Sequence, residues 1–124
     1  MVNITNAEME IMRIIWDSGE RVTTKDIMEK LPGKKTTTIL TLASRLIDKG
    51  VLKSVKLGRS HAHEYWAAIS EEDYQKMQTR NFIRSIHNGS AKSLISTLFQ
   101  DEDLTQEDIE ELRDFIEKQV KSHD

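Results

Sequence analysis

A chain of 124 residues with 37% hydrophobic and 31% charged side chains is long enough for one small domain, or for one domain with a helical extension. It contains no cysteine, which excludes disulfides, cysteine-bound zinc and a thiol nucleophile. The sequence shows neither a signal-peptide pattern nor an apolar run near the roughly 18 residues of a membrane helix. We therefore expect a cytoplasmic protein without membrane insertion.

The net charge of −3 divides unevenly along the chain. Residues 1–69 carry 11 basic and 8 acidic side chains, whereas residues 70–124 carry 7 basic and 13 acidic ones. Seven of the basic side chains fall within residues 34–66, against two acidic ones. The first part therefore suits a polyanionic partner, and nucleic acid should repel the second part. A solvated basic surface explains the same bias equally well, so charge alone does not decide.

Two capping boxes mark the first two predicted helices. Thr5 and Glu8 should begin one helix, and Thr23 and Asp26 should begin a shorter one that stops at Pro32. In both helices the apolar residues recur at helical spacing, which predicts that one face of each packs into a core. The side chains that we expect to point inward are Ile11, Met12, Ile15, Trp16, Ile27, Met28 and Leu31.

A third helix is predicted over residues 36–49, with Gly50 as its left-handed terminator. Its buried stripe should consist of the apolar residues Ile39, Leu42, Ala43, Leu46 and Ile47. The opposite face carries the short hydroxylated side chains Thr37, Thr38, Thr41 and Ser44. Threonine lowers helix propensity because branching at Cβ restricts its side chain. An exposed helix face rich in threonine therefore suggests a functional requirement.

Two β-prone segments, residues 51–57 and 60–68, follow this helix and are joined at Gly58-Arg59. Polar and apolar residues alternate along the first segment, as in a hairpin. Three helices followed by a two-stranded hairpin predict a mainly α fold with a small β-hairpin, the winged helix-turn-helix. In that fold the third helix enters the major groove of DNA and the hairpin lies along the backbone. We place this DNA-binding domain at residues 1–69.

Residues 70–124 are expected to form a helical dimerisation domain. Ser70 should cap a fourth helix that ends at Asn88-Gly89, a fifth helix follows, and Thr105 and Asp108 should begin a sixth. These helices are amphipathic but contain few aromatic residues, so pairing with a second copy is the natural way to bury their apolar faces. At the homodimer interface we expect Leu94, Leu98, Phe99, Ile109, Leu112 and Ile116.

The hydroxylated face of the third helix predicts base reading in double-stranded DNA by Thr37, Thr38, Thr41 and Ser44. Thr38 and Thr41 project together, so their methyl groups can contact a thymine methyl while their hydroxyls bond to base edges. Phosphate contacts should come from polar side chains around the helix entry and the hairpin. These are Lys34, Lys35, Thr36, Arg45, Lys53, Lys56, Arg59 and His61.

Other functional classes find little support in the sequence. His61 and His63 have a spacing that places both imidazoles on one side of a strand, but no cysteine supports a metal site, and we predict no metal and no cofactor. We predict no enzyme, because no histidine–nucleophile pattern or phosphate-binding glycine loop is present. Two alternatives stay open: a winged helix that binds a protein, and a DNA-binding regulator of other genes that is induced by a small ligand.

Over nearly its full length the chain resembles the penicillinase and methicillin-resistance repressor family (the BlaI/MecI type). In the first half the resemblance is carried by Asn6-Ala7-Glu8-Met9-Glu10-Ile11-Met12, Trp16 and Thr38-Ile39-x-Thr41-Leu42-x-x-Arg45-Leu46-x-x-Lys49-Gly50. In the second half it is carried by Asn81-Phe82-Ile83, Asn88-Gly89, Ser93-Leu94 and Leu104-Thr105-x-x-Asp108-Ile109-Glu110-Glu111-Leu112. The order and spacing of these pieces together are specific, although each piece alone is weak.

The resemblance implies a homodimeric repressor that binds a palindromic operator upstream of β-lactam-resistance genes. It also implies release by a membrane-bound sensor metalloprotease that cleaves an Asn–Phe bond, which in this chain would be Asn81–Phe82. The chain departs from the family in two places. Residues 34–37 are Lys-Lys-Thr-Thr where relatives commonly have Trp-Ser-Pro-Lys, and the apolar Leu40 replaces a commonly polar residue. The operator sequence and the regulated genes therefore stay open.

Overall fold

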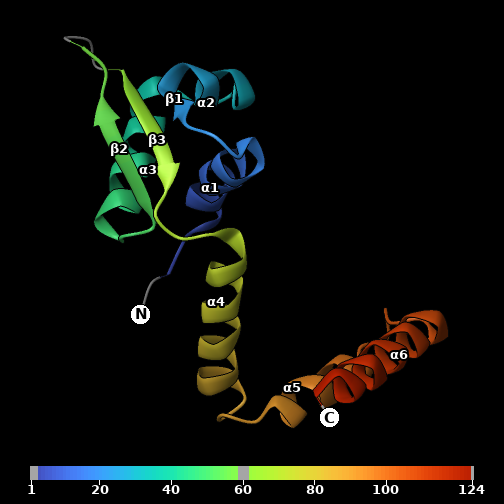
Figure 1. Ribbon diagram of the computed structural model, residues 1–124. Coiled ribbons are helices and arrows are strands. Elements are labelled where there is room, and N and C mark those ends of the chain that lie inside the picture. Colours follow the sequence, from blue (N-terminus) through green and yellow to red (C-terminus); the bar gives the residue numbers. More distant parts are fainter. Residues whose placement is uncertain (1–2, 59–61, 124) are drawn as a thin grey trace. The chain divides into compact units, whose positions relative to one another are not determined.

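The computed structural model describes residues 3–58 and 62–123 (Figure 1). The chain forms two compact units, Met1–Met77 and Gln78–Asp124, and the helix α4 (Glu71–Ile86) runs through the boundary between them. The molecule is mostly helical with one small antiparallel sheet. The predicted fold class, a winged helix followed by a helical region, is confirmed.

The first unit consists of three helices and a three-stranded sheet that packs against them (Figure 1). Its elements are α1 (Asn6–Ser18), β1 (Val22–Thr23), α2 (Thr24–Lys30), α3 (Thr36–Asp48), β2 (Leu52–Lys56) and β3 (His63–Ala67). The strands β2 and β3 form the predicted hairpin, with Leu52 opposite Ala67. The strand β1 pairs with the other edge of β3, through Val22 opposite Tyr65. This third strand was not predicted, because two residues are too few to show an alternating pattern.

Local side-chain chemistry sets the starts of several helices as predicted. The Glu8 amide donates to the Thr5 hydroxyl at 3.2 Å, and the Asp26 amide donates to the Thr23 hydroxyl at 3.1 Å. Both capping boxes are complete, because each cap amide in turn donates to the carboxylate three residues later. The amide of Asp108 donates to the Thr105 hydroxyl in the same way at the start of α6 (Gln106–His123).

The end of α3 is fixed by its own backbone. Gly50 has φ +80°, and its amide donates to the Ile47 carbonyl at 2.9 Å. The Val51 amide donates to the Leu46 carbonyl at 3.2 Å, and Val51 is buried. This pair of bonds is the Schellman motif, which needs a residue with positive φ at the glycine position. The helix therefore ends at Asp48, with Lys49 as its C-cap residue.

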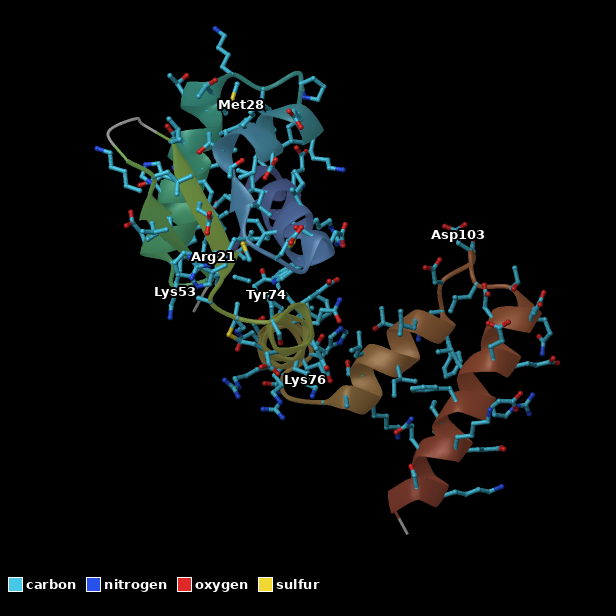
Figure 2. The ribbon with its side chains drawn as sticks, turned by 45° about the horizontal axis from the view of Figure 1, so that its top comes forward. Arg21, Met28, Lys53, Tyr74, Lys76 and Asp103 are labelled. Carbon is cyan, nitrogen blue, oxygen red and sulfur yellow. The ribbon has the colours of Figure 1, made fainter. Side chains whose placement is uncertain are left out.

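The hydrophobic core lies in the first unit. It consists of side chains from all three helices and the sheet: Ile11, Met12, Ile15, Val22, Ile27, Ile39, Leu42, Ala43, Leu46, Val51, Leu52 and Tyr65. Two predicted core positions were wrong, because Ile47 is 37% exposed and Met28 is 39% exposed. Ile47 lies about 100° around the helix from Leu46 and faces a surface hollow beside Trp66. Met28 lies at the surface of α2 (Figure 2), where it accepts a 3.5 Å hydrogen bond from the Thr36 hydroxyl.

Within the first unit, Trp16 of α1 contacts the segment that follows β3. Its indole Nε1 donates to the Ile69 carbonyl at 3.0 Å, and its ring centroid lies 5.6 Å from that of Tyr74, near the start of α4 (Figure 2). A buried indole requires such an acceptor for its N–H. The chain that leaves β3 is therefore held against α1.

The second unit contains the last turns of α4, then α5 (Ala91–Phe99) and α6. Asn88 and Gly89 both have positive φ and turn the chain between α4 and α5. His87 Nδ1 lies 2.9 Å from the Ser93 hydroxyl, and the His87 ring meets the Phe82 ring edge-on at 5.3 Å. None of the described residues of this unit is buried. These helices therefore have no closed core within a single chain.

The packing of α3 is testable with two adjacent residues of opposite burial. Leu46→Ala removes a fully buried side chain and should lower the free energy of unfolding by about 2–5 kcal/mol. Ile47→Ala removes a partly exposed side chain and should cost about 1 kcal/mol or less. Urea unfolding followed by circular dichroism measures both values. Equal losses for the two variants would contradict a helix orientation in which Leu46 faces the core and Ile47 faces the surface.

Candidate nucleic-acid interface

One face of α3 is exposed and rich in hydroxyl groups. The burial of Ile39, Leu42 and Leu46 fixes the rotation of the helix about its axis. The predicted base-reading residues Thr37, Thr38, Thr41 and Ser44 are all exposed as a result. A shallow surface hollow of about 260 Å³ is lined by Thr37, Thr38, Thr41, Leu42 and Arg45. The structure thus brings three of the four predicted residues together with Arg45, while Ser44 lies outside this hollow.

The hydroxyls on this face are not equivalent. The Thr41 hydroxyl donates its proton to the Thr37 carbonyl of the same helix at 2.9 Å. Its oxygen then offers only acceptor lone pairs to an outside group, beside an exposed methyl group. The Thr36 hydroxyl instead donates to the Met28 sulfur, a weak acceptor. Thr41 is therefore suited to accept from a base amino group or to contact a thymine methyl.

The start of α3 combines backbone donors with basic side chains. Lys35 is the N-cap residue and makes no side-chain capping bond. The first amides of a helix lack partners within the helix, so they and the helix dipole favour an anion there. Lys35 is exposed, whereas Lys34 is half-buried with its ammonium 3.7 Å from the Glu10 carboxylate. An ion pair of that length at the surface holds a lysine only weakly.

The hairpin adds further basic side chains. Lys53 and Lys56 are exposed on β2, and Lys53 lies opposite Trp66 on β3. The guanidinium of Arg21 lies 4.2 Å from the centroid of the Trp66 ring and 3.1 Å from the Glu64 carboxylate. Figure 2 labels Arg21 and Lys53. Sequence patterns could not predict this cluster of Arg21, Glu64 and Trp66, because its members come from distant parts of the chain. Arg59 and His61, both predicted phosphate contacts, lie outside the described residues.

Lys49 is one of the seven basic residues within 34–66, but it forms an ion pair with another residue of the protein. Its ammonium donates to both carboxylate oxygens of Glu8, at 2.7 and 2.8 Å, and to the Asn3 carbonyl at 2.7 Å. Glu8 is 1% exposed. Burial alone would raise the pKa of this carboxyl, but the hydrogen bonds from Lys49 and Thr5 outweigh it and hold the pKa below its ordinary value. The Glu8 carboxylate therefore stays charged at neutral pH.

Asn81 and Phe82, the predicted cleavage site, lie inside α4. The Asn81 carbonyl accepts a hydrogen bond from the Ser85 hydroxyl at 2.9 Å. Asn81 is half-buried, and the Phe82 side chain is 47% exposed. The peptide bond between them thus belongs to a regular helical turn with one exposed side chain.

The predicted dimer residues lie at the surface of the second unit. Leu98, Phe99 and Ile116 are exposed, and Leu94, Ile109 and Leu112 are half-buried. A hollow of about 420 Å³ is lined by Phe99 of α5 and by Gln106, Ile109, Arg113, Ile116 and Glu117 of α6. Exposed apolar side chains outside the predicted set are Phe82, Ile86, Ile95, Phe115 and Val120. These residues carry the same amphipathic signal, and the prediction named only part of it.

Residues 3–58 and 62–123 contain neither a clustered metal site nor a membrane-spanning helix. Within that range no group of three or more histidine, aspartate or glutamate side chains is placed to hold a metal ion. No helix there is long and apolar enough to cross a lipid bilayer. The histidine pair at 61 and 63 is described only at His63, whose Nδ1 is buried without a hydrogen-bond partner.

Three packed helices, a β-hairpin wing and an exposed polar third helix define a winged-helix protein. A sequence profile of the penicillinase repressor family matches residues 4–118. The chain is 33% identical over 118 residues to the methicillin resistance regulatory protein MecI of Staphylococcus aureus, a match that spans 93% of this chain and 94% of MecI. It is 31% identical over 118 residues to the penicillinase repressor of Bacillus licheniformis, over 93% and 90% of the two chains.

The chain therefore belongs to the penicillinase repressor family. The predicted resemblance is confirmed, and the protein is a transcriptional repressor of the BlaI/MecI type. Membership in a family of transcriptional repressors implies that it binds DNA.

Proposed function

We propose that this repressor binds a palindromic operator as a homodimer, with α3 of each protomer in the major groove. The observation that carries the proposal is the exposed threonine face of α3, with Thr37, Thr38 and Thr41 beside Arg45 in one surface hollow. Base edges are read by Thr37, Thr38, Thr41 and Ser44. Phosphates are held by Lys34, Lys35, Thr36, Arg45, Lys53 and Lys56, together with Arg59 and His61.

The regulated genes are of the β-lactam-resistance type. This part of the proposal is supported by the printed names of the relatives, which refer to methicillin resistance and to penicillinase. The departures at residues 34–37 and at Leu40 lie at the entry and on the surface of α3. They should change which operator the protein prefers rather than whether it binds DNA.

Dimerisation occurs through the helices of the predicted dimerisation domain, residues 70–124, which includes the whole second unit. The support is the apolar surface that a single chain leaves uncovered, including Leu98, Phe99 and Ile116. Homodimers commonly bury such faces against the same face of a second copy. Release then follows from cleavage of the Asn81–Phe82 bond by a membrane-bound sensor metalloprotease, because the cut separates the DNA-binding domain from α5 and α6.

DNA binding should depend steeply on salt. If the dimer neutralises about 6–10 phosphates, its affinity for a duplex selected from a random-sequence library should fall about 10³–10⁵-fold between 50 and 200 mM salt. Lys35→Ala should reduce the slope of log affinity against log salt by about 1.8 per dimer, since each protomer loses one contact. Fluorescence anisotropy measures both quantities. Lys118→Ala, in the acidic part of the chain, is the matched control and should leave the slope unchanged. Failure to retain any duplex at 50 mM salt would overturn the proposed function.

Dimerisation is testable by charge substitution in α5. Leu98→Asp places a carboxylate on the proposed interface and should convert the dimer to a monomer, because an unpaired charge is costly to bury. Thr97→Asp introduces the same charge at the neighbouring exposed residue and should leave the dimer intact. Sedimentation velocity at micromolar concentration distinguishes the two, and circular dichroism checks that both variants keep their helices. A wild-type monomer under these conditions would contradict the interface.

Cleavage is testable with Asn81→Ala/Phe82→Ala, which alters both sides of the proposed bond. This variant should bind DNA as the wild type does and should remain full-length in cells exposed to a β-lactam, so that repression persists. Lys92→Ala, at an exposed residue of α5, leaves the proposed bond unchanged and should be cleaved normally. Mass spectrometry of the recovered chain identifies any fragment that ends at residue 81. Normal induction with the double variant would place the inducing event elsewhere.

A further inference from the structure

We infer that the Glu8–Lys49 pair positions α3 for base reading, and that Lys49 itself does not contact DNA. The inference rests on the proposed function of α3 as the operator-reading helix. It assigns to two residues outside the reading face a role in sequence selectivity. Lys49 becomes a positioning residue, although its charge and its place in the basic stretch make it resemble a phosphate contact.

The pair joins the end of α3 to the beginning of α1. Lys49 is the C-cap residue of α3, and Glu8 is the third residue of α1, where it also completes the capping box with Thr5. The Lys49 ammonium reaches both Glu8 oxygens and the Asn3 carbonyl, all within 2.8 Å. An ammonium group has three donors, so these three acceptors satisfy it completely. One lysine therefore links α3 to two separate points at the N-terminal end of α1.

This link supplies a directional constraint that the core does not. The apolar contacts of Ile39, Leu42 and Leu46 resist separation of α3 from the core, but the hydrophobic effect that drives them is not directional. Hydrogen bonds between charged groups are short and directional, and they lose strength when the geometry changes. The bond from Thr36 to the Met28 sulfur at the other end of α3 is weak, at 3.5 Å. The Lys49 end thus sets the axial position of the helix.

The same geometry argues against a phosphate contact by Lys49. To reach a phosphate, the ammonium would leave Glu8 as a buried carboxylate without its cationic partner, which is strongly unfavourable. Lys49 also lies eleven residues beyond Thr38, about 16 Å farther along the helix. Arg45, by contrast, is exposed and lines the hollow that contains Thr38 and Thr41. The two basic residues stand one helical turn apart and should behave differently when their charge is removed.

The test compares Lys49→Met, Glu8→Gln, their double variant and Arg45→Met in the full-length chain. The probes are a duplex selected by the wild type from a random-sequence library and a random-sequence duplex of equal length. Selectivity is the ratio of the two affinities at one salt concentration, and the salt slope is measured on the random duplex. Circular dichroism confirms that each variant is folded at the measuring temperature, and the near-isosteric Glu8→Gln covers the case in which Lys49→Met is unstable.

Lys49→Met should lower selectivity about tenfold, as for the loss of one base contact, and leave the salt slope unchanged. Arg45→Met should lower both affinities and reduce the slope by about 1.8 per dimer. Glu8→Gln removes a negative charge, which by simple electrostatics would strengthen DNA binding, yet it should also lower selectivity. Because both residues act through one contact, the double variant should resemble the single variants.

Two results would overturn the inference while leaving the proposed function standing. The first is a Lys49→Met variant that loses slope and both affinities in parallel, as Arg45→Met does. The second is unchanged selectivity in folded Lys49→Met and Glu8→Gln. If the wild type selects no duplex at all, operator binding itself is wrong and this inference falls with it, so the wild-type measurement separates the two failures.

Discussion

The packing of one face of α3 into the core decides which of its side chains face solvent and, in the proposed complex, DNA. Ile39, Leu42 and Leu46 are buried, and the 3.6-residue period of the helix then turns Thr38 and Thr41 outward. A rotation of one residue would bury a hydroxyl and expose an apolar side chain. The threonine face is therefore a consequence of core packing, and the ion pair between the buried Glu8 and the half-buried Lys49 adds the directional contact proposed above.

The two units differ in how much apolar surface a single chain buries. In the first, α1, α2, α3 and the sheet close a core within a single chain. In the second, none of the described side chains is buried, and Phe115 is 60% exposed. An uncovered apolar surface of this kind marks an interaction site in a soluble protein. In the proposed function, DNA binding and dimerisation depend on separate parts of the chain, so that cleavage of α4 would remove the second without unfolding the first.

The sequence predicted those features that depend on neighbouring residues. The capping boxes at Thr5 and Thr23 and the terminator Gly50 form as expected, because their partners lie within four residues. Features that depend on distant residues were missed. The strand β1 exists only because β3 offers it an edge, and the partner of Lys49 is Glu8, 41 residues away. Charge counting therefore could not separate Lys49 from the exposed lysines. The DNA contacts and the dimer interface stay predictions.

The central claim is that the threonine face of α3 reads bases in both halves of a palindromic site. Selection from a random duplex library by the wild type, by Thr38→Ala/Thr41→Ala and by Thr97→Ala tests it directly. Thr97 is also an exposed helical threonine whose hydroxyl donates to a backbone carbonyl, so it controls for the substitution itself. The α3 variant should lose preference at the same positions in both half-sites while their spacing, about one helical turn or a multiple of it, persists. An unchanged consensus sequence for that variant would show that the threonine face does not read bases.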